Sequence, residues 1–290
     1  MKFRAFTGQI PNFVGGFSGF SPTGPSSILW NVNTYKLTGS LNVAAVGETG
    51  PTGLWFKPDG TKLFLVGAAL DRIRAWDLTT AWDINTVTNA VGMTGALLDN
   101  TGVALPSITG IAFSDDGTKA FVTDNVNQAL YRYTLSTAWD ISTLNGVNAD
   151  QVNTAIYTGS LNPSSIWIRT DGLMISTANT GTTVRISQWT TTVANDITTL
   201  SLFTQTGGGS TPVGAVWVDN GNKLIFVLQG TDTVQVNTYS SPYTFASPVV
   251  LGTRLVTSQD TTPQDIYMKN DGTAFYYLGS ATDTIYQFTL

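Results

Sequence analysis

The side chains with which enzymes most often move protons or hold metals are scarce in this sequence. The 290-residue chain contains no histidine and no cysteine, and Glu48 is its only glutamate. This composition excludes imidazole bases, thiol nucleophiles and zinc–thiolate sites. The carboxylates of the aspartates and Glu48 remain to be weighed. Glycoside cleavage is one reaction that carboxylates carry out, and it generally needs two of them roughly 5–10 Å apart.

Most of the aspartates recur at fixed places, which favours structural roles. One group precedes a glycine in a tight turn, and Asn220 takes the same place in another copy. An Asp-to-Asn exchange suits turn chemistry and contradicts a shared catalytic role. This group comprises Asp59, Asp116, Asp171 and Asp271. A second group, Asp83, Asp140 and Asp196, is placed to cap a later turn of each repeat.

The elements that must position these aspartates repeat about every fifty residues. Each copy begins with a short apolar strand, followed by the Asp-Gly or Asn-Gly turn and a second strand, as in Gly110–Thr123. Two further strands complete the copy. Five such copies predict a radial or linear β array, because one copy cannot bury its own faces.

The two ends of the chain complement each other. The last copy stops after its third strand, Thr284–Leu290, and residues 34–40 resemble the fourth strand of a copy. We expect these residues to supply the outer strand of the last blade, which closes a ring and removes an exposed sheet edge. The sequence thus predicts an all-β fold, a five-bladed β-propeller of four-stranded blades over residues 28–290, closed by an N-terminal strand.

Four carboxylates fall outside the two recurring groups. They precede first strands and are expected near one end of the central channel: Glu48, Asp99, Asp260 and Asp265. Asp265 stands where the other copies have Gly53, Gly110, Ser165 and Ala215. These residues are the candidates for an alternative function, that of a carbohydrate-binding, lectin-like propeller or a glycoside-hydrolase propeller.

Aromatic residues share one position of the first strand. They are Trp55, Trp167, Trp217 and Tyr267, with Ala112 in the second copy. Stacking on sugars is one interpretation. Packing between neighbouring blades is favoured, because mid-strand positions of radial sheets face the next blade.

Residues 1–27 differ from the repeats and are predicted to form an extended N-terminal arm. Glycine and proline interrupt any helix or long strand there. A disordered leader is one interpretation. The aromatic content favours the other, an anchor that orders on a partner. The anchoring side chains would be Phe3, Phe6, Phe13, Phe17 and Phe20.

The composition bounds the partners. Charged residues make up 11% of the chain, against about 25% in typical soluble domains, and the net charge is −5. The basic residues are scattered, which argues against nucleic acid. No stretch has the length of a membrane span, the N-terminus does not resemble a secretory signal, and no calcium-loop motif is present. The sequence predicts no cofactor and no metal.

One repeat carries a resemblance to known proteins. The segments Asp116–Val122 and Leu130–Thr143 resemble the propeller repeats of tailed-bacteriophage structural proteins, and related units occur in bacterial surface propellers of the YVTN type. The resemblance covers about residues 28–290. It is strongest in the first, second and last copies. The third and fourth depart from it, with Leu173-Met174 in place of Thr-Lys and Pro242-Tyr243 in place of Trp-Asp.

The resemblance implies a non-enzymatic virion structural protein, made in the host cytoplasm and displayed on the particle as a tail-fibre, host-attachment or head-decoration component. Residues 1–27 would bind other virion proteins, and a trimer is the expected homo-oligomer. The variable loops share one face, and a host surface glycan or receptor would bind there. The loop residues proposed for this recognition are Asp71, Asp99, Asn100, Asn125, Asn127, Asn179, Asp232 and Asp283.

Overall fold

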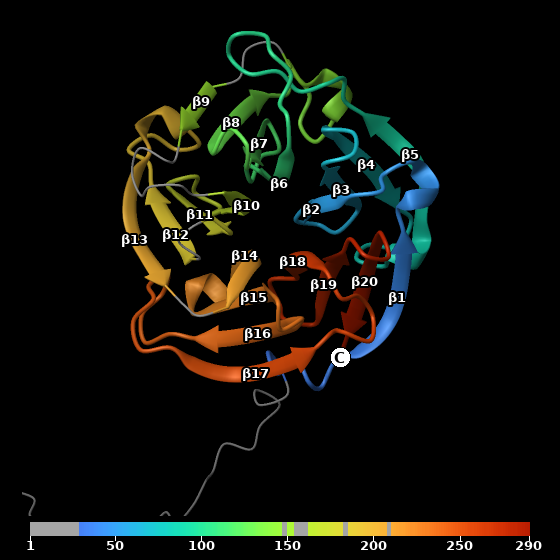
Figure 1. Cartoon of the computed structure of the whole chain (residues 1–290), viewed down its shortest axis with the longest axis vertical. Coiled ribbons are helices and arrows are strands. Elements are labelled where there is room, and N and C mark those ends of the chain that lie inside the picture. The colour runs from blue at the N-terminus through green and yellow to red at the C-terminus, as the bar shows by residue number, and fades with distance from the viewer. Residues whose placement is uncertain (1–28, 147–149, 154–161, 182–184, 208–209) are drawn as a thin grey trace, which may run out of the picture.

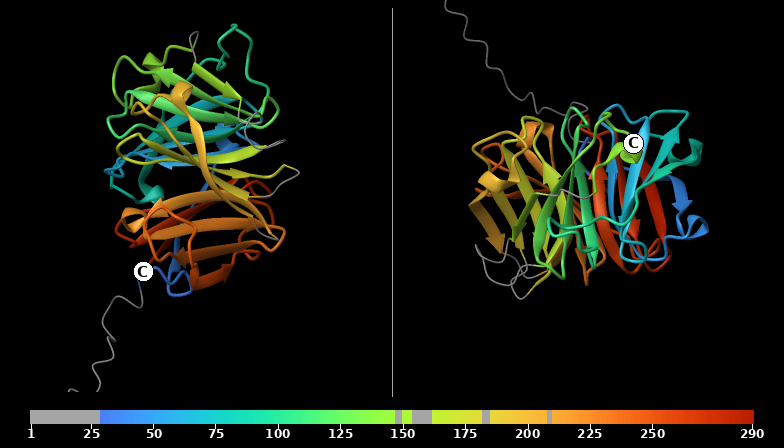
Figure 2. Two further views of the ribbon diagram at one scale, coloured as in Figure 1. Left: turned by 90° about the vertical axis from the view of Figure 1, so that its left-hand side faces the viewer. Right: turned by 90° about the horizontal axis from the view of Figure 1, so that it is seen from above.

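Five antiparallel sheets of four strands stand around a common axis (Figure 1). The structure is a computed structural model, and it describes residues 29–146, 150–153, 162–181, 185–207 and 210–290. Seen from the side, the sheets form a short cylinder (Figure 2). The predicted five-bladed β-propeller is confirmed. The arm predicted for residues 1–27, with its five phenylalanines, lies outside the described residues.

In each blade the first strand lies nearest the axis and the fourth lies at the rim (Figure 1). The strands are, for blade 1, β2 (Pro51–Phe56), β3 (Lys62–Gly67), β4 (Arg72–Leu78) and β5 (Val87–Met93); for blade 2, β6 (Ile108–Phe113), β7 (Lys119–Asp124), β8 (Ala129–Thr134) and β9 (Asp150–Asn153); for blade 3, β10 (Pro163–Ile168), β11 (Met174–Asn179), β12 (Arg185–Thr190) and β13 (Ser201–Gly207); for blade 4, β14 (Thr211–Val218), β15 (Lys223–Gln229), β16 (Thr233–Thr238) and β17 (Val249–Leu255); and for blade 5, β18 (Pro263–Met268), β19 (Ala274–Gly279), β20 (Thr284–Thr289) and β1 (Lys36–Asn42).

Blade 5 is assembled from both ends of the chain, as expected. β1 pairs antiparallel with β20, with Leu41 opposite Ile285. The preceding Tyr35 is buried, donates its hydroxyl hydrogen to the Gly272 carbonyl and packs its ring 5.3 Å from that of Phe275. The ring of blades is therefore held closed by strand pairing and by aromatic packing.

A contact between two turns recurs in every blade. The hairpin glycine has a positive φ, and a residue from the turn between strands three and four, itself at positive φ, packs against it. A Cβ on Gly117 would lie 2.2 Å from the ring of Trp139, so no larger residue fits there. The covering residues of blades 1 to 5 are Trp82, Trp139, Asn195, Tyr243 and Trp30. The two copies that depart from the motif thus keep the contact with other side chains.

Both recurring groups of aspartates serve these turns, as predicted. Asp116 accepts hydrogen bonds from the backbone N–H and the hydroxyl of Thr118 in the hairpin turn, at 3.0 and 2.9 Å. Asp140 caps a short 3-10 helix, η4 (Ile141–Thr143), by accepting from the Ser142 N–H at 3.0 Å. The same caps begin η3 (Ile84–Thr86) and η5 (Ile197–Thr199). Two further 3-10 helices are η2 (Ala44–Val46) and η6 (Asp219–Gly221).

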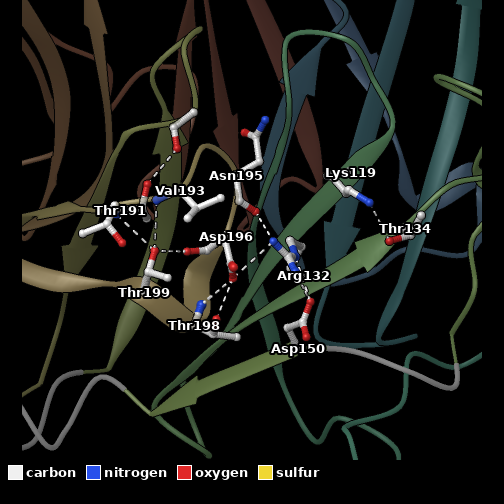
Figure 3. A network of polar contacts seen from close by, with 12 residues as sticks. Lys119, Arg132, Thr134, Asp150, Thr191, Val193, Asn195, Asp196, Thr198 and Thr199 are labelled. Atoms are coloured by element: carbon white, nitrogen blue, oxygen red, sulfur yellow. Dashed lines mark hydrogen bonds and ion pairs between the residues drawn. The ribbon is translucent and has the colours of Figure 1, made fainter.

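A polar side chain of strand three links neighbouring blades. Arg132 of β8 donates from Nε to Asp150 Oδ2 at 2.8 Å, and its guanidinium also reaches the Asn195 carbonyl and Asp196 of blade 3 (Figure 3). Gln287 of β20 occupies the same place and accepts from the Ile84 N–H of blade 1 at 2.8 Å. These contacts join blade 2 to blade 3 and blade 5 to blade 1. The helices of the described residues are too short to cross a membrane.

Candidate functional site

The innermost strands come close to one another along part of the axis. A Cβ on Gly53 would lie 2.8 Å from the Gly110 Cα, and one on Gly110 would lie 2.7 Å from the Ser165 Cα. Glycine at these places lets neighbouring backbones approach where a side chain would collide with them. Any cavity on the axis must therefore lie beside other residues of these strands.

A pocket of about 190 Å³ opens where the innermost strands end. Residues of all five blades line it, from Trp55 and Pro58 of blade 1 to Tyr267 and Asn270 of blade 5, which places it on the propeller axis. We call it the axial aromatic pocket, after the six aromatic residues in its wall: Trp55, Phe113, Trp167, Trp217, Tyr243 and Tyr267. It lies at the end carrying the Asp-Gly turns, opposite the face on which recognition was predicted.

Two pairs of rings in this wall meet at steep angles. Trp55 and Tyr267 lie 5.3 Å apart at 80°, and Trp217 and Tyr243 lie 5.9 Å apart at 60°. Trp167 stacks on Tyr243 at 5.9 Å. The shared first-strand position is thus buried, as the packing interpretation expects, but its four aromatic side chains also form the wall of a cavity. Sequence reasoning did not predict this cavity wall, because that prediction requires the position of each inner strand relative to the propeller axis.

The indole N–H groups of the wall differ in their partners. Trp217 donates from Nε1 to the Ser176 hydroxyl at 3.1 Å. Trp55 is 7% exposed, and its buried Nε1 has no hydrogen-bond partner among the described residues. Leaving a buried donor unpaired costs about 1–3 kcal/mol.

The charged groups beside the pocket are mostly neutralised. Arg169 is paired with Asp171 through two contacts of 2.8 and 2.7 Å, and its guanidinium lies 5.3 Å from the centre of the Tyr243 ring. The hydrogen bond from Arg169 is the main cause that lowers the pKa of Asp171. Asp219 is paired with Lys223. Asp115 is exposed, and the described residues provide no ion pair for it.

Asp265 lies two residues before Tyr267 on β18 and does not line the pocket. It is 4% exposed, and its Oδ2 accepts a hydrogen bond from the Leu54 N–H of blade 1 at 2.9 Å. Burial raises the pKa of this carboxyl well above its usual range, although backbone hydrogen bonds from Leu54 and Ile266 oppose the shift. Asp265 therefore joins blades 5 and 1 as a carboxyl held toward its neutral form.

Glu48 and Asp260 hold loops at the opposite face. Asp260 accepts hydrogen bonds from the N–H groups of Thr262 and Thr282 at 2.7 and 2.8 Å. Glu48 accepts backbone hydrogen bonds from Ala69 and Gly50, and burial raises its pKa. Each carboxylate lies over a glycine that ends strand two: a Cβ on Gly67 or Gly279 would lie 2.3 or 2.2 Å from it.

Blade 2 achieves the same capping in another way. Asp124 stands at the strand-two position that Gly67 and Gly279 occupy in their blades, opposite the first residue of the inner strand. Its carboxylate accepts from the N–H groups of Val126 and Asn127 at 2.8 and 2.7 Å. Sequence reasoning missed this exchange, because the capping residue moves from the loop to the strand. The structure therefore assigns Glu48 and Asp260 to loop capping.

Asp99 is bound within its own loop, where it accepts from the N–H groups of Thr101 and Val103 at 2.8 and 2.9 Å. The hydrogen bond from Val103 is the largest of the causes that lower its pKa. Glu48, Asp99 and Asp260 thus serve separate turns and form no catalytic pair. Within the described ranges, no three acidic side chains gather closely enough to hold a metal ion.

Several residues proposed for recognition also shape the loops. Asp71 has φ 50° and accepts from the Ile108 N–H at 3.0 Å, and buried Asn179 donates to the Arg185 carbonyl at 3.2 Å. Asn127 donates to the Tyr131 hydroxyl at 3.1 Å.

The other residues proposed for recognition differ in their surroundings. Asp232 and Asp283 have φ values of 48° and 50°. Asn100 is exposed, and Asn125 has a buried carbonyl oxygen without a partner among the described residues. Recognition by these loops stays a prediction.

Comparison with known proteins supports the fold. No protein-family model and no curated protein sequence matches the chain. A solved structure from Bacteroides fragilis, provisionally described as a 6-phosphogluconolactonase, has a TM-score of 0.52 at 12% identity and covers 82% of this chain and 80% of its own. A similarly described protein of Bacteroides uniformis has a TM-score of 0.49, 12% identity and coverages of 80% and 64%. The periplasmic gluconolactonase of Pseudomonas aeruginosa has a TM-score of 0.47, 14% identity and coverages of 69% and 53%.

These comparisons correct the function expected from the sequence. The chain spans 64% and 53% of the last two proteins, and at such identities the likeness extends to the fold alone. The Bacteroides fragilis structure carries a lactonase name and is not a virion component. The expectation of a non-enzymatic virion structural protein is therefore contradicted. The β-propeller fold that the same resemblance implied is supported.

Proposed function

We propose that this protein binds a small molecule in the axial aromatic pocket. The observation that carries the proposal is a cavity of about 190 Å³ to which all five blades contribute and whose wall contains six aromatic residues. Ligand sites are typically concave and lined by aromatic side chains together with a few polar groups. The volume suits one ring, because an apolar cavity of about 150 Å³ holds benzene.

A lactone is the first class of ligand to test. The similar Bacteroides fragilis structure carries a lactonase name, and a lactone combines a single ring with a carbonyl oxygen. Enzymatic turnover is a second property to measure in the same samples. The exposed Asp115 carboxylate lines the pocket, and in such a reaction it would serve as the general base for an attacking water.

Titration of the full chain, followed by tryptophan fluorescence, tests the proposal. The ligands are glucono-δ-lactone, 6-phosphoglucono-δ-lactone and choline, which represent an uncharged, an anionic and a cationic molecule. We expect saturable binding of at least one of them, weakened by Trp167→Phe, which shrinks one wall of the pocket. The control Trp76→Phe changes a buried tryptophan outside the pocket and should leave binding unchanged.

Two outcomes would contradict the proposal. Binding that Trp167→Phe leaves unaltered would place the ligand elsewhere on the molecule. No binding of any of the three ligands would remove the support for a small-molecule site on the axis.

A further inference from the structure

We propose that a cavity between blades 1 and 2 binds the primary carboxamide group of a small molecule or of a polypeptide side chain. The cavity has a volume of about 380 Å³, and among the described residues it shares none with the axial aromatic pocket. Its lining includes the buried residues Ala75 and Ile141 and the exposed residues Ala138 and Asp140, so it extends from the surface into the junction.

The junction between blades 5 and 1 shows which groups occupy the equivalent place there. Gln287 of β20 accepts a hydrogen bond from the Ile84 N–H at 2.8 Å. Tyr276 of β19, which is paired with Gln287 across the two strands, donates its hydroxyl hydrogen to the Trp82 carbonyl. Two side chains of blade 5 thus satisfy one backbone donor and one backbone acceptor in the last turn of blade 1.

Blade 1 lacks both of these polar side chains. Ala75 of β4 stands at the strand position of Gln287. Phe64, which is paired with Ala75, stands at that of Tyr276. The Phe64 ring packs on Phe113 of blade 2 at 4.3 Å and 38°, the same distance and angle at which Tyr276 packs on its neighbour in blade 1. The rings therefore superpose in role, and only the hydroxyl and the carboxamide are missing.

The turn of blade 2 presents the same two backbone groups without partners. The Ile141 N–H corresponds to that of Ile84, since each follows the aspartate that caps its turn. The Trp139 carbonyl corresponds to that of Trp82. Among the described residues, neither of these blade 2 groups has a hydrogen-bond partner, although backbone groups usually find one. Ala75 lines the cavity on one side and this turn on the other, so the cavity lies where the carboxamide is missing.

The rim strand argues against a guanidinium group as the ligand. In blade 2 the equivalent place holds Arg132, and Asp150 stands opposite it on the rim strand and accepts from its Nε at 2.8 Å. Opposite Ala75 the rim strand has Gly92. Blade 1 thus resembles blade 5, in which Gly39 stands opposite the carboxamide of Gln287.

The charges at the cavity argue against an anion. Lys57 and Lys62 line it, but their ammonium groups lie 2.7 and 2.5 Å from the carboxylates of Asp59 and Asp77. Asp140 adds a further negative charge to the lining. An uncharged carboxamide fits best, because its oxygen can accept from the Ile141 N–H while its NH₂ donates to the neighbouring carbonyl.

Titration of the ¹⁵N-labelled full chain with propionamide, followed by NMR, tests the proposal. Propionamide has the same end group as a glutamine side chain. The Ile141 amide resonance should shift saturably. Ala75→Gln supplies the carboxamide from the chain itself and should weaken this response about ten-fold. Ala81→Gln changes an exposed alanine outside the cavity and should leave the response unchanged.

The converse variant is Gln287→Ala, which opens the equivalent place between blades 5 and 1. The Ile84 amide, which has its partner in the wild type, should then respond to propionamide. Thermal unfolding of both variants shows whether they fold cooperatively, and either one alone is sufficient for the test.

Several outcomes would overturn the proposal. They are an Ile141 amide that does not respond to propionamide, an equal response in Ala75→Gln, and a stronger response to propionate or methylguanidinium. The peptides Gly-Gln-Gly and Gly-Ala-Gly identify the source of the group. A response to the first peptide alone indicates a polypeptide side chain, and a response to propionamide but to neither peptide indicates a free amide.

Discussion

Asp265 shows how much a single residue depends on the assembled ring. Sequence reasoning singled it out, because a carboxylate replaces small residues of the other copies, and placed it among candidates for carbohydrate chemistry. The structure buries it between blades 5 and 1, with the Leu54 N–H as its partner. Its departure from the repeat could be read from the sequence. Its burial could not, because the Leu54 backbone comes from a blade more than two hundred residues away.

The raised pKa of Asp265 makes stability depend on pH. The folded protein retains this proton above the pH at which the unfolded chain releases it, near pH 4. The contribution is therefore complete below that pH and is lost as pH rises toward the folded-state pKa, at about 1.4 kcal/mol per pH unit. Asp265→Asn should flatten this decline above pH 4, as measured by urea unfolding.

Asp115→Asn is the control for this measurement, because Asp115 is exposed and the described residues give it no partner. Its unfolding free energy should follow the pH dependence of the wild type. Equal pH dependence of Asp265→Asn and the wild type would mean that Asp265 is ionised in the folded state.

At the scale of the elements, the hairpin turn could be predicted but its cover could not. The Asp-Gly pair indicates a turn by itself, because glycine tolerates a positive φ. The aromatic ring over it comes from a turn about twenty residues later, at Trp82 and Trp139. In blade 5 the covering residue is Trp30, from the other end of the chain, and in blade 4 it is Tyr243. Only the folded blade shows that these residues share one role.

Replacing the hairpin glycine should therefore lower the free energy of unfolding by more than backbone strain alone would. Gly117→Ala places a Cβ 2.2 Å from the Trp139 ring at φ 70°, and we expect a loss of about 3 kcal/mol in unfolding free energy. Gly102 has φ 86° but open space around it, so Gly102→Ala should cost only about 1 kcal/mol. Chemical denaturation measures both variants, and equal losses would show that the ring is easily displaced.

At the scale of the whole molecule, closure of the ring determines both stability and the site. The strand count and the pairing of the two chain ends could be predicted, because both follow from the repeat and its interruption. The pocket could not, since it depends on how far five inner strands stand from one axis. The aromatic residues were visible at their shared position, but that position is typical of packing as well as of a cavity wall.

Removal of residues 1–42 tests the closure. The truncated chain loses β1, the cover of Gly272 and the hydrogen bond that the Arg254 guanidinium donates to the Tyr35 carbonyl at 2.7 Å. It should also expose the free edge of β20, beside the buried Phe288. We expect no cooperative thermal transition at the midpoint of the full chain, and partial recovery when a peptide of residues 29–43 is added. An unchanged transition would show that four blades and a three-stranded fifth are sufficient.

The exchange of capping residues between blades limits how this chain can be shuffled by recombination. In blades 1 and 5 the carboxylate arrives from the preceding loop and needs a glycine beneath it, whereas in blade 2 the strand carries its own carboxylate. A copy cut at the start of its inner strand would separate Glu48 from Gly67. Such a copy of blade 1 or 5, inserted behind a loop without a carboxylate, would lack its cap. A copy of blade 2 inserted behind Glu48 or Asp260 would bring two carboxylates into contact. The segment of blades 1 and 5 that can be exchanged as a unit therefore begins in the loop that precedes the first strand.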